Sequence, residues 1–198
     1  MNLSASPFAV GHRKKRQAVV KKTAALFKSP VLYTNMVGGQ DEIIFDGGSF
    51  AMNEKGQMLA QSVFFEEDLN LVDLEKSLGG TRNIQTNDIE HLYQALVLGI
   101  RDYARITGIK RAHLGLSGGI DSALVACLAV EALGAGQVSC VAMPGPFSAP
   151  ESLSLARTLA RNLKCEFIEV GIEKQYEAIK SSLDQAFATK EFGVMHEN

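Results

Sequence analysis

The stretch from Gly115 to Ala123, Gly-Leu-Ser-Gly-Gly-Ile-Asp-Ser-Ala, constrains the fold of this chain more than any other. A short apolar run, 112–116, precedes the two glycines and predicts a buried strand, and an apolar helical pattern follows them. Such a strand, turn and helix start form an anion site, because backbone N–H groups converge there and the helix dipole adds partial positive charge. The pattern therefore predicts a phosphate-binding loop.

The side chains of this loop indicate how a phosphate would be held. Ser117 and Ser122 offer hydroxyl groups to phosphate oxygens, and the glycines let the backbone approach closely. Asp121 would repel a phosphate unless a cation lay between them, so it predicts a bound Mg²⁺. The lysine of a Walker loop is absent. A strand–turn–helix corner that binds no ligand is the plain structural alternative.

The loop resembles the SGGxDS pyrophosphate loop of the N-type ATP pyrophosphatases, which transfer AMP to a substrate and release pyrophosphate. This resemblance implies ATP and Mg²⁺ as cofactors. It also implies that Met143, after the predicted strand 138–142, contacts the adenosine part of ATP, with a core methionine as the alternative. The ATP-binding residues implied in this way are Gly115, Leu116, Ser117, Gly118, Gly119, Ile120, Asp121, Ser122 and Met143.

Composition excludes several classes of partner. A formal net charge of −2 gives no bulk affinity for nucleic acid or membrane surfaces. No apolar run approaches the roughly 20 residues that span a bilayer, and no signal peptide is evident. The three cysteines lack the spacing of metal ligands and are predicted to be small buried side chains in a reducing cytoplasm.

Charge is distributed unevenly and predicts a domain boundary. Residues 1–28 carry seven Lys or Arg and no acid, whereas 40–75 carry nine Asp or Glu against one Lys. Residues 76–198 are nearly balanced, with twelve basic and thirteen acidic side chains. We therefore expect one folded region over 1–75, a linker over 76–86, and a second region over 87–198.

Hydrophobic patterning predicts an α/β protein in both regions. In the first, short strands with polar turns and one basic helix indicate a layered α/β sandwich. In the second, strands alternate with helices, which predicts a doubly wound parallel sheet with its ligand at the carboxyl ends of the strands. The strands expected are 2–8, 31–36, 43–45, 49–52, 58–63, 69–74, 112–116, 138–142 and 166–170. The helices expected are 11–28, 87–107, 120–133, 150–163 and 173–188, and 53–56 is expected to form a hairpin turn.

Three further motifs in the first region carry a second resemblance. The runs 2–8 (Asn-Leu-Ser-Ala-Ser-Pro-Phe), 37–42 (Val-Gly-Gly-Gln-Asp-Glu) and 45–49 (Phe-Asp-Gly-Gly-Ser) resemble the closing third of a nitrilase-type glutamine amidase domain. Followed by the phosphate loop, they are similar to the glutamine-dependent NAD⁺ synthetases. The fold this implies is the end of a nitrilase-type α-β-β-α sandwich, then a sheet of the adenine nucleotide alpha hydrolase (ATP pyrophosphatase) type.

The same resemblance implies a reaction and its partners. Glutamine would be hydrolysed in one domain, and the ammonia would amidate deamido-NAD⁺ in the other, in an enzyme expected to form homo-oligomers. Ser6 and His12 would border the glutamine pocket. The Cys, Glu and Lys of the amidase would lie before residue 1, so the chain is expected to be a fragment without those catalytic groups.

Two other functions stay open. The chain could be a natural non-catalytic module for nucleotide binding or subunit interaction. It could also belong to another SGGxDS enzyme, such as a GMP synthetase-like amidotransferase. In either case a half-sheet is expected to leave unpaired edges and an exposed apolar face.

Overall fold

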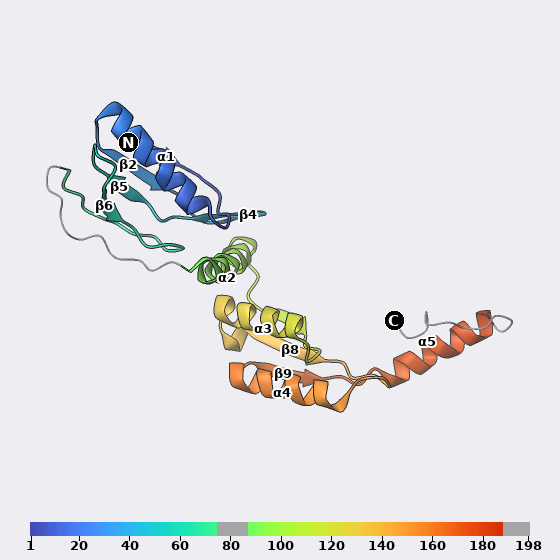
Figure 1. Ribbon diagram of the computed structural model, residues 1–198. Helices are drawn as coiled ribbons and strands as arrows, with labels where there is room; N and C mark the ends of the chain where they lie inside the picture. The colour runs from blue at the N-terminus through green and yellow to red at the C-terminus, as the bar shows by residue number, and fades with distance from the viewer. Residues whose placement is uncertain (75–86, 188–198) are drawn as a thin grey trace. The chain divides into compact units, whose positions relative to one another are not determined.

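The computed structural model describes residues 1–74 and 87–187, which form two compact units (Figure 1). The first unit runs from Met1 to Lys110 and the second from Arg111 onward. Both mix helices with strands, and the second contains a parallel sheet, so the α/β architecture predicted from the sequence is confirmed. No helix in these ranges is long and apolar enough to cross a membrane.

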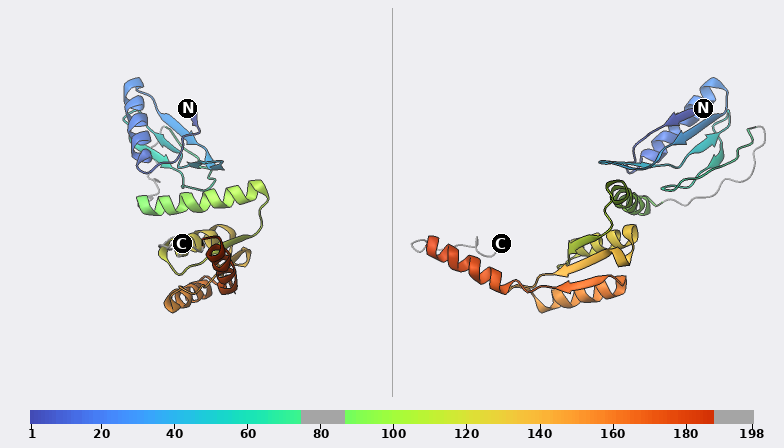
Figure 2. Two further views of the ribbon diagram at one scale, coloured as in Figure 1. Left: turned by 90° about the vertical axis from the view of Figure 1, so that its right-hand side faces the viewer. Right: turned by 180° about the vertical axis from the view of Figure 1, so that it is seen from behind.

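A four-stranded sheet with one helix across it forms the body of the first unit (Figures 1 and 2). The strand order is β1-β2-β5-β6, with β1 parallel to β2 and the other neighbours antiparallel. Val20 and Ala24 are buried, while Lys14, Lys15, Lys21 and Lys22 are exposed. The elements are β1 (Asn2–Ser4), α1 (His12–Phe27), β2 (Val31–Asn35), β5 (Phe50–Met52) and β6 (Met58–Gln61).

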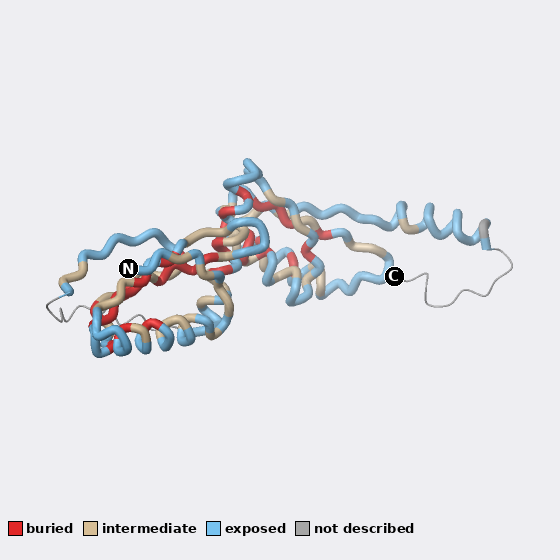
Figure 3. The backbone as a smooth tube through the Cα atoms, turned by 90° about the horizontal axis from the view of Figure 1, so that it is seen from above, coloured by how far each residue is buried: buried red, intermediate tan, exposed pale blue. Residues whose placement is uncertain are grey.

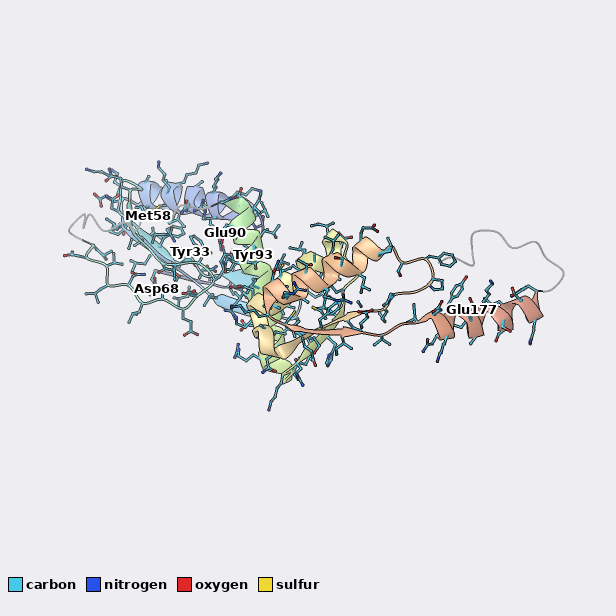
Figure 4. All side chains as sticks on the ribbon, turned by 90° about the horizontal axis from the view of Figure 1, so that it is seen from below. Tyr33, Met58, Asp68, Glu90, Tyr93 and Glu177 are labelled. Atoms are coloured by element: carbon cyan, nitrogen blue, oxygen red, sulfur yellow. The ribbon has the colours of Figure 1, made fainter. Side chains whose placement is uncertain are left out.

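Aromatic and aliphatic side chains join this helix to the sheet. Val20 packs with Tyr33, Phe50 and Met52, and the rings of Tyr33 and Phe50 stack with their centroids 5.0 Å apart. Met58, labelled beside Tyr33 in Figure 4, packs against the same cluster. This cluster is the apolar part of the attachment of α1 to the sheet, and a hydrogen bond from Gln17 to Gln61 of β6 adds a polar part.

The turn between β5 and β6 forms as the sequence predicts. The side-chain oxygen of Asn53 accepts hydrogen bonds from the backbone N–H groups of Lys55, at 3.0 Å, and Gln57, at 2.9 Å. Gly56 has a φ of 71°, which a residue with a Cβ rarely adopts. This self-bonded turn confirms the predicted hairpin.

A second, two-stranded sheet and a long helix complete the first unit. Strand β3 (Val37–Gln40) pairs antiparallel with β4 (Ile43–Asp46), and α2 (Asp88–Thr107) packs on both. Asn87 caps α2 by accepting from the N–H of Ile89, as expected of a helix start.

Three expectations for the first unit are wrong. Strand β3 was not expected, because its two glycines indicate a turn rather than a strand. Residues 69–74 form no strand, and Leu69 and Leu71 are 95% and 101% exposed. The predicted buried strand 2–8 is only β1, where Leu3 is 75% exposed, because β1 pairs along a single edge and no layer covers it.

The second unit is built on three parallel strands in the order β7-β8-β9. Its helices and strands agree with the predicted ranges to within about two residues, as helix boundaries usually do. They are β7 (Ala112–Gly115), α3 (Ile120–Leu133), the short 3₁₀ helix η1 (Ala135–Gln137), β8 (Val138–Ala142), α4 (Pro150–Leu163), β9 (Glu166–Glu169) and α5 (Glu173–Ala186).

One face of this parallel sheet carries the core. Helices α3 and α4 contact each other and the sheet, and their alanines pack with Val138 and Cys140 of β8. On the other face, Ile168 of β9 is 37% exposed, and α5 is almost wholly exposed (Figure 3). Within 111–187 the sheet therefore has a buried face and an open, partly apolar one, as expected of a half-sheet.

The first compact unit ends at Lys110, so it includes α2 as well as residues 1–74. Helix α2 lies C-terminal to 76–86, yet it packs on β3 and β4 and so counts with the first unit. Residues 75–86, which hold that linker, lie outside the described residues. The domain limits 1–75 and 87–198 stay a prediction about how the sequence is organised.

Candidate functional site

The predicted phosphate loop lies where β7 ends and α3 begins. The N–H of Leu116 donates to the carbonyl oxygen of Val141 at 2.8 Å, which extends the β7–β8 pairing by one residue. Leu116 is 2% exposed and anchors the loop in the core. Gly118 then adopts a φ of 83°, and Gly119 precedes the first turn of α3. The loop thus sits at the carboxyl end of a parallel strand, where such sheets bind ligands.

Hydroxyl groups tie the two sides of the loop together. The Oγ atoms of Ser117 and Ser122 lie 3.0 Å apart, and the Ser122 Oγ also accepts from the N–H of Ser117 at 3.2 Å. The N–H of Gly119 donates to the Ser117 Oγ at 3.2 Å. The Ser122 Oγ donates in turn to the carbonyl oxygen of Gly119 at 3.1 Å. These groups thus bond to one another at one helix start, and a phosphate at this position would replace these contacts with bonds to its own oxygens.

Gly118 lets the loop touch the first turn of α4. A Cβ at this position would lie 2.2 Å from the carbonyl oxygen of Ser152 and 2.8 Å from its Cα. Both atoms belong to the backbone, so neither could move aside without shifting the helix. The contact and the positive φ together explain why glycine is needed here.

A pocket of about 390 Å³ opens beside the loop. Ser117 and Leu116 form one side, and Met143, which is 55% exposed, forms another. The ring of Phe147 also lines it and stands edge-on to Tyr176 of α5, with centroids 5.6 Å apart. The lining is Leu116, Ser117, Ala142, Met143, Pro144, Phe147, Ser148, Ala149, Ser152 and Leu153.

The structure brings the predicted ATP residues to one edge of the sheet. Met143 directly follows β8, and its exposure contradicts the alternative that it is a core methionine. The sequence analysis missed the other wall of the pocket, from Pro144 to Leu153. Two signals were available, since this segment follows the strand next to β7 and Pro150 marks a helix start there.

Asp121 suits a metal ion that arrives with a nucleotide. It lies in the first turn of α3, is exposed, and offers carboxylate oxygens, the donors that Mg²⁺ prefers. Within 1–74 and 87–187 no cluster of three metal-binding side chains exists. Mg²⁺ is commonly held by one or two carboxylates together with substrate phosphates and water, so a single aspartate fits it.

The two predicted glutamine-pocket residues lie in the first unit. Ser6 is half-buried just beyond β1, and His12 is the exposed first residue of α1. Gly11 precedes His12 with a φ of 79° and turns the chain into the helix. The structure records no hydrogen bond between these two side chains, and their role as a glutamine site stays a prediction.

Buried polar groups hold the backbone at Ser6. Asn35 accepts from the N–H of Ser6 at 2.8 Å and donates to its carbonyl oxygen at 3.3 Å. The amide nitrogen of Asn35 also donates to Asp46, at 3.2 Å, and Asp46 is 1% exposed. Arg16 pairs with both carboxylate oxygens of Asp46, at 2.8 Å from Nη1 to Oδ1. This network was not predicted from the sequence, because nothing in the basic run 13–16 distinguishes Arg16 from its exposed neighbours Lys14 and Lys15.

Burial and charge act in opposite senses on Arg16. Burial lowers the pKa of its guanidinium, while the hydrogen bond and the negative charge of Asp46 raise it, and the net effect raises the pKa. The guanidinium of Arg16 is therefore a permanent positive charge beside the Asp46 side chain.

Known proteins with similar sequences identify the family of this chain. The sequence model of a family described as NAD synthase matches residues 92–198, more than half of the chain. The chain belongs to the NAD synthase family. Two curated relatives are glutamine-dependent NAD(+) synthetases of Synechocystis sp. and Rhodobacter capsulatus, each 42% identical to this member of the family. They cover 100% and 98% of the chain, which itself spans 36% of the length of each relative.

Solved structures agree with this assignment. The glutamine-dependent NAD⁺ synthetase from Acinetobacter baumannii, in complex with ADP, superposes on the whole chain with a TM-score of 0.91 and 32% identity. That of Cytophaga hutchinsonii superposes on 98% of it, with a TM-score of 0.85 and 20% identity, which shows a shared fold. The chain covers 39% and 40% of those two proteins. The resemblance to the glutamine-dependent NAD⁺ synthetases, drawn from the sequence motifs, is therefore confirmed.

Proposed function

We propose that this NAD synthase family chain binds ATP at the loop 115–122 and serves a glutamine-dependent NAD⁺ synthetase. Such an enzyme amidates deamido-NAD⁺ to NAD⁺ through an adenylated intermediate and releases AMP and pyrophosphate. The observation that carries the proposal is the loop itself: two serine hydroxyls and a glycine turn at the start of α3, next to a pocket of about 390 Å³. The relative with bound ADP supports a nucleotide as the ligand.

Each residue of the loop has a separate task in this proposal. Ser117, Ser122 and the N–H of Gly119 would hold the oxygens of the departing pyrophosphate as their charge grows. Met143 and Phe147 would border the nucleoside part of ATP, since both line the pocket next to Ser117. Asp121 would hold Mg²⁺, which neutralises phosphate charge when it is bound.

For the first unit we propose descent from a nitrilase-type glutamine amidase. The four-stranded sheet with α1 on one face supports this, and so does Ser6, whose backbone is held by the buried Asn35. Ser6 and His12 would then border the glutamine site. The parallel strands β7–β9 would belong to a doubly wound sheet of the adenine nucleotide alpha hydrolase type. A cytoplasmic location fits the three free cysteines, and we propose that the intact enzyme is a homo-oligomer, as the resemblance to its family implies.

The acceptor substrate distinguishes the proposed function from a GMP synthetase-like activity. The complete product of the gene is incubated with ATP, Mg²⁺ and ammonia, and with either deamido-NAD⁺ or XMP. Pyrophosphate release with deamido-NAD⁺ alone is the expected result, together with formation of NAD⁺. Release with XMP alone, or equal release without either acceptor, would overturn the assignment. Asp121→Ala is expected to abolish the reaction, and Asp88→Ala, on the exposed start of α2, to leave it intact.

A further inference from the structure

Helix α2 matches the NAD synthase family in sequence but packs with the first unit in the structure. The NAD synthase match begins at residue 92, so most of α2 (Asp88–Thr107) belongs to that match. In the structure, however, α2 packs on the hairpin of β3 and β4 and counts with the first unit. The contacts between α2 and the β3–β4 hairpin therefore show what holds the helix in the first unit.

Backbone touches backbone along this contact. A Cβ on Gly39 of β3 would lie 3.4 Å from the Cα of Gly99 on α2, and one on Gly99 would lie 3.0 Å from Ile44 of β4. Glycines on both sides thus allow an approach that larger residues would prevent. Ala95 and Leu98 of α2 complete the contact by packing in one apolar cluster with Ile44.

A buried charge lies at the centre of the same contact. Asp102 of α2 is 8% exposed, and its Oδ2 accepts from the N–H of Gly39 at 2.7 Å. Its Oδ1 pairs with Arg105 one turn later, at 3.2 Å from Nη2. A carboxylate this buried is costly unless it is hydrogen-bonded, so the position of α2 along the hairpin is fixed by this pairing. A shift of the helix by one turn would cost Asp102 the N–H of Gly39, its hydrogen-bond partner on the hairpin, while Arg105 would move with the helix.

We infer that Asp102 is a positioning residue that fixes α2 on the β3–β4 hairpin, so that this helix folds and unfolds with the first unit. Under the proposed function, on which this consequence rests, α2 is the element shared by the glutamine-handling and ATP-using parts of the enzyme. The loop at 115–122 begins only eight residues after α2 ends at Thr107. A displaced α2 would therefore act on the short segment that leads into β7.

Hydrogen exchange of the 198-residue chain, read amide by amide, tests the inference. In the unsubstituted chain the amides of α2 are expected to exchange in step with those of β3 and β4, and not with those of β7 and β8. Asp102→Ala is expected to speed exchange at Gly39 at least about tenfold, the effect of losing a hydrogen bond to a charged group. It is expected to speed exchange in α2 and β4 and to leave β7 and β8 unchanged.

Two further variants keep the test decisive. Asp102→Asn retains an oxygen that can accept from Gly39, so most of the protection is expected to return. Asp88→Ala removes a carboxylate from the exposed end of the same helix and is expected to change exchange at Gly39 by less than about twofold. The inference is overturned if α2 exchanges in step with β7, if Asp102→Ala leaves Gly39 protected, or if Asp88→Ala has the same effect. None of these exchange measurements needs ATP, so a failure of the proposed function would not change their result.

Discussion

The ion pair of Arg16 and Asp46 is the residue-scale feature on which the first unit depends most. Asp46→Ala is expected to lower the free energy of unfolding of this unit by about 3–5 kcal/mol, because a buried guanidinium would lose its partner. The side chains of Arg16 and Asp46 are 12% and 1% exposed, so solvent cannot replace the lost charge. Urea unfolding measures the change. Lys14→Ala, on the exposed side of α1, serves as the control and should stay within about 0.5 kcal/mol. A loss below about 1 kcal/mol for Asp46→Ala would contradict this account of the pair.

Gly118 is the residue on which the phosphate loop of the second unit depends most. Gly118→Ala places a Cβ against the backbone of Ser152 and strains a residue whose φ is 83°. We expect a loss of stability of about 1–3 kcal/mol and the loss of nucleotide binding. Thermal unfolding and calorimetric titration with ATP measure the two effects. Gly136→Ala is the matched control, since a Cβ there meets nothing within 4 Å. Equal behaviour of the two variants would show that the loop does not rest on α4.

At the scale of elements, the join between α2 and the segment after β6 depends on pH. His91 of α2 packs against the rings of Phe64 and Phe65, with distances between ring centroids of 4.6 Å and 5.4 Å. Burial, and then the charge of Arg13, lower the pKa of His91 below its ordinary value of 6.5. The unfolded chain therefore takes up a proton at a higher pH than the folded one, and stability should fall as the pH drops below about 6.5.

Urea unfolding at pH 7.5 and pH 5.5 checks this expectation. The unsubstituted chain should be less stable at the lower pH, and His91→Gln should lose most of the difference. Carboxylates contribute little in this interval because their ordinary pKa values lie near 4. Equal stability at the two pH values would mean that His91 is protonated in the folded protein as easily as in the unfolded one.

Local patterning predicted the elements of the second unit well and those of the first less well. In α3, α4 and β8 the boundaries follow from local sequence: Gly134 ends α3, Pro150 begins α4, and the apolar run 138–142 forms β8. Strand β3 could not be found in this way, because Gly38 and Gly39 are in a strand through tertiary contacts: they pair with β4 and leave no room for a side chain against α2. Residues 69–74 show the converse. Their alternating leucines predict a strand, but the structure gives them no neighbouring strand to pair with.

Tertiary packing also limited what could be predicted of the site. The loop 115–122 was found because its glycines, serines and aspartate are informative on their own. Met143 came from the resemblance, and its position after β8 agrees with it. Phe147 and Ser152 were missed, since only the packing of α4 against Gly118 brings them to the loop. Asn35 and Asp46 were missed for the same reason, as their roles depend on contacts between distant segments.

At the scale of the whole molecule, the functions assigned to the two units rest on different observations. The family match covers the second unit and most of α2, whereas the amidase-like role that we propose for the first unit rests on motifs and on the backbone hydrogen bonds at Ser6. The chain spans about a third of its relatives' length, so binding at the loop can be measured here more directly than the full reaction. Binding is also the step on which the rest of the proposed chemistry depends.

Calorimetric titration of the 198-residue chain with ATP, with and without Mg²⁺, is therefore the most direct measurement. We predict saturable binding to one site that requires Mg²⁺, that Asp121→Ala abolishes, and that Asp88→Ala leaves unchanged. Protection of the backbone N–H groups of 117–122 on addition of ATP should accompany it. Binding that is indifferent to Mg²⁺ and to Asp121→Ala, or no binding by a folded chain, would contradict the assignment of this loop to ATP.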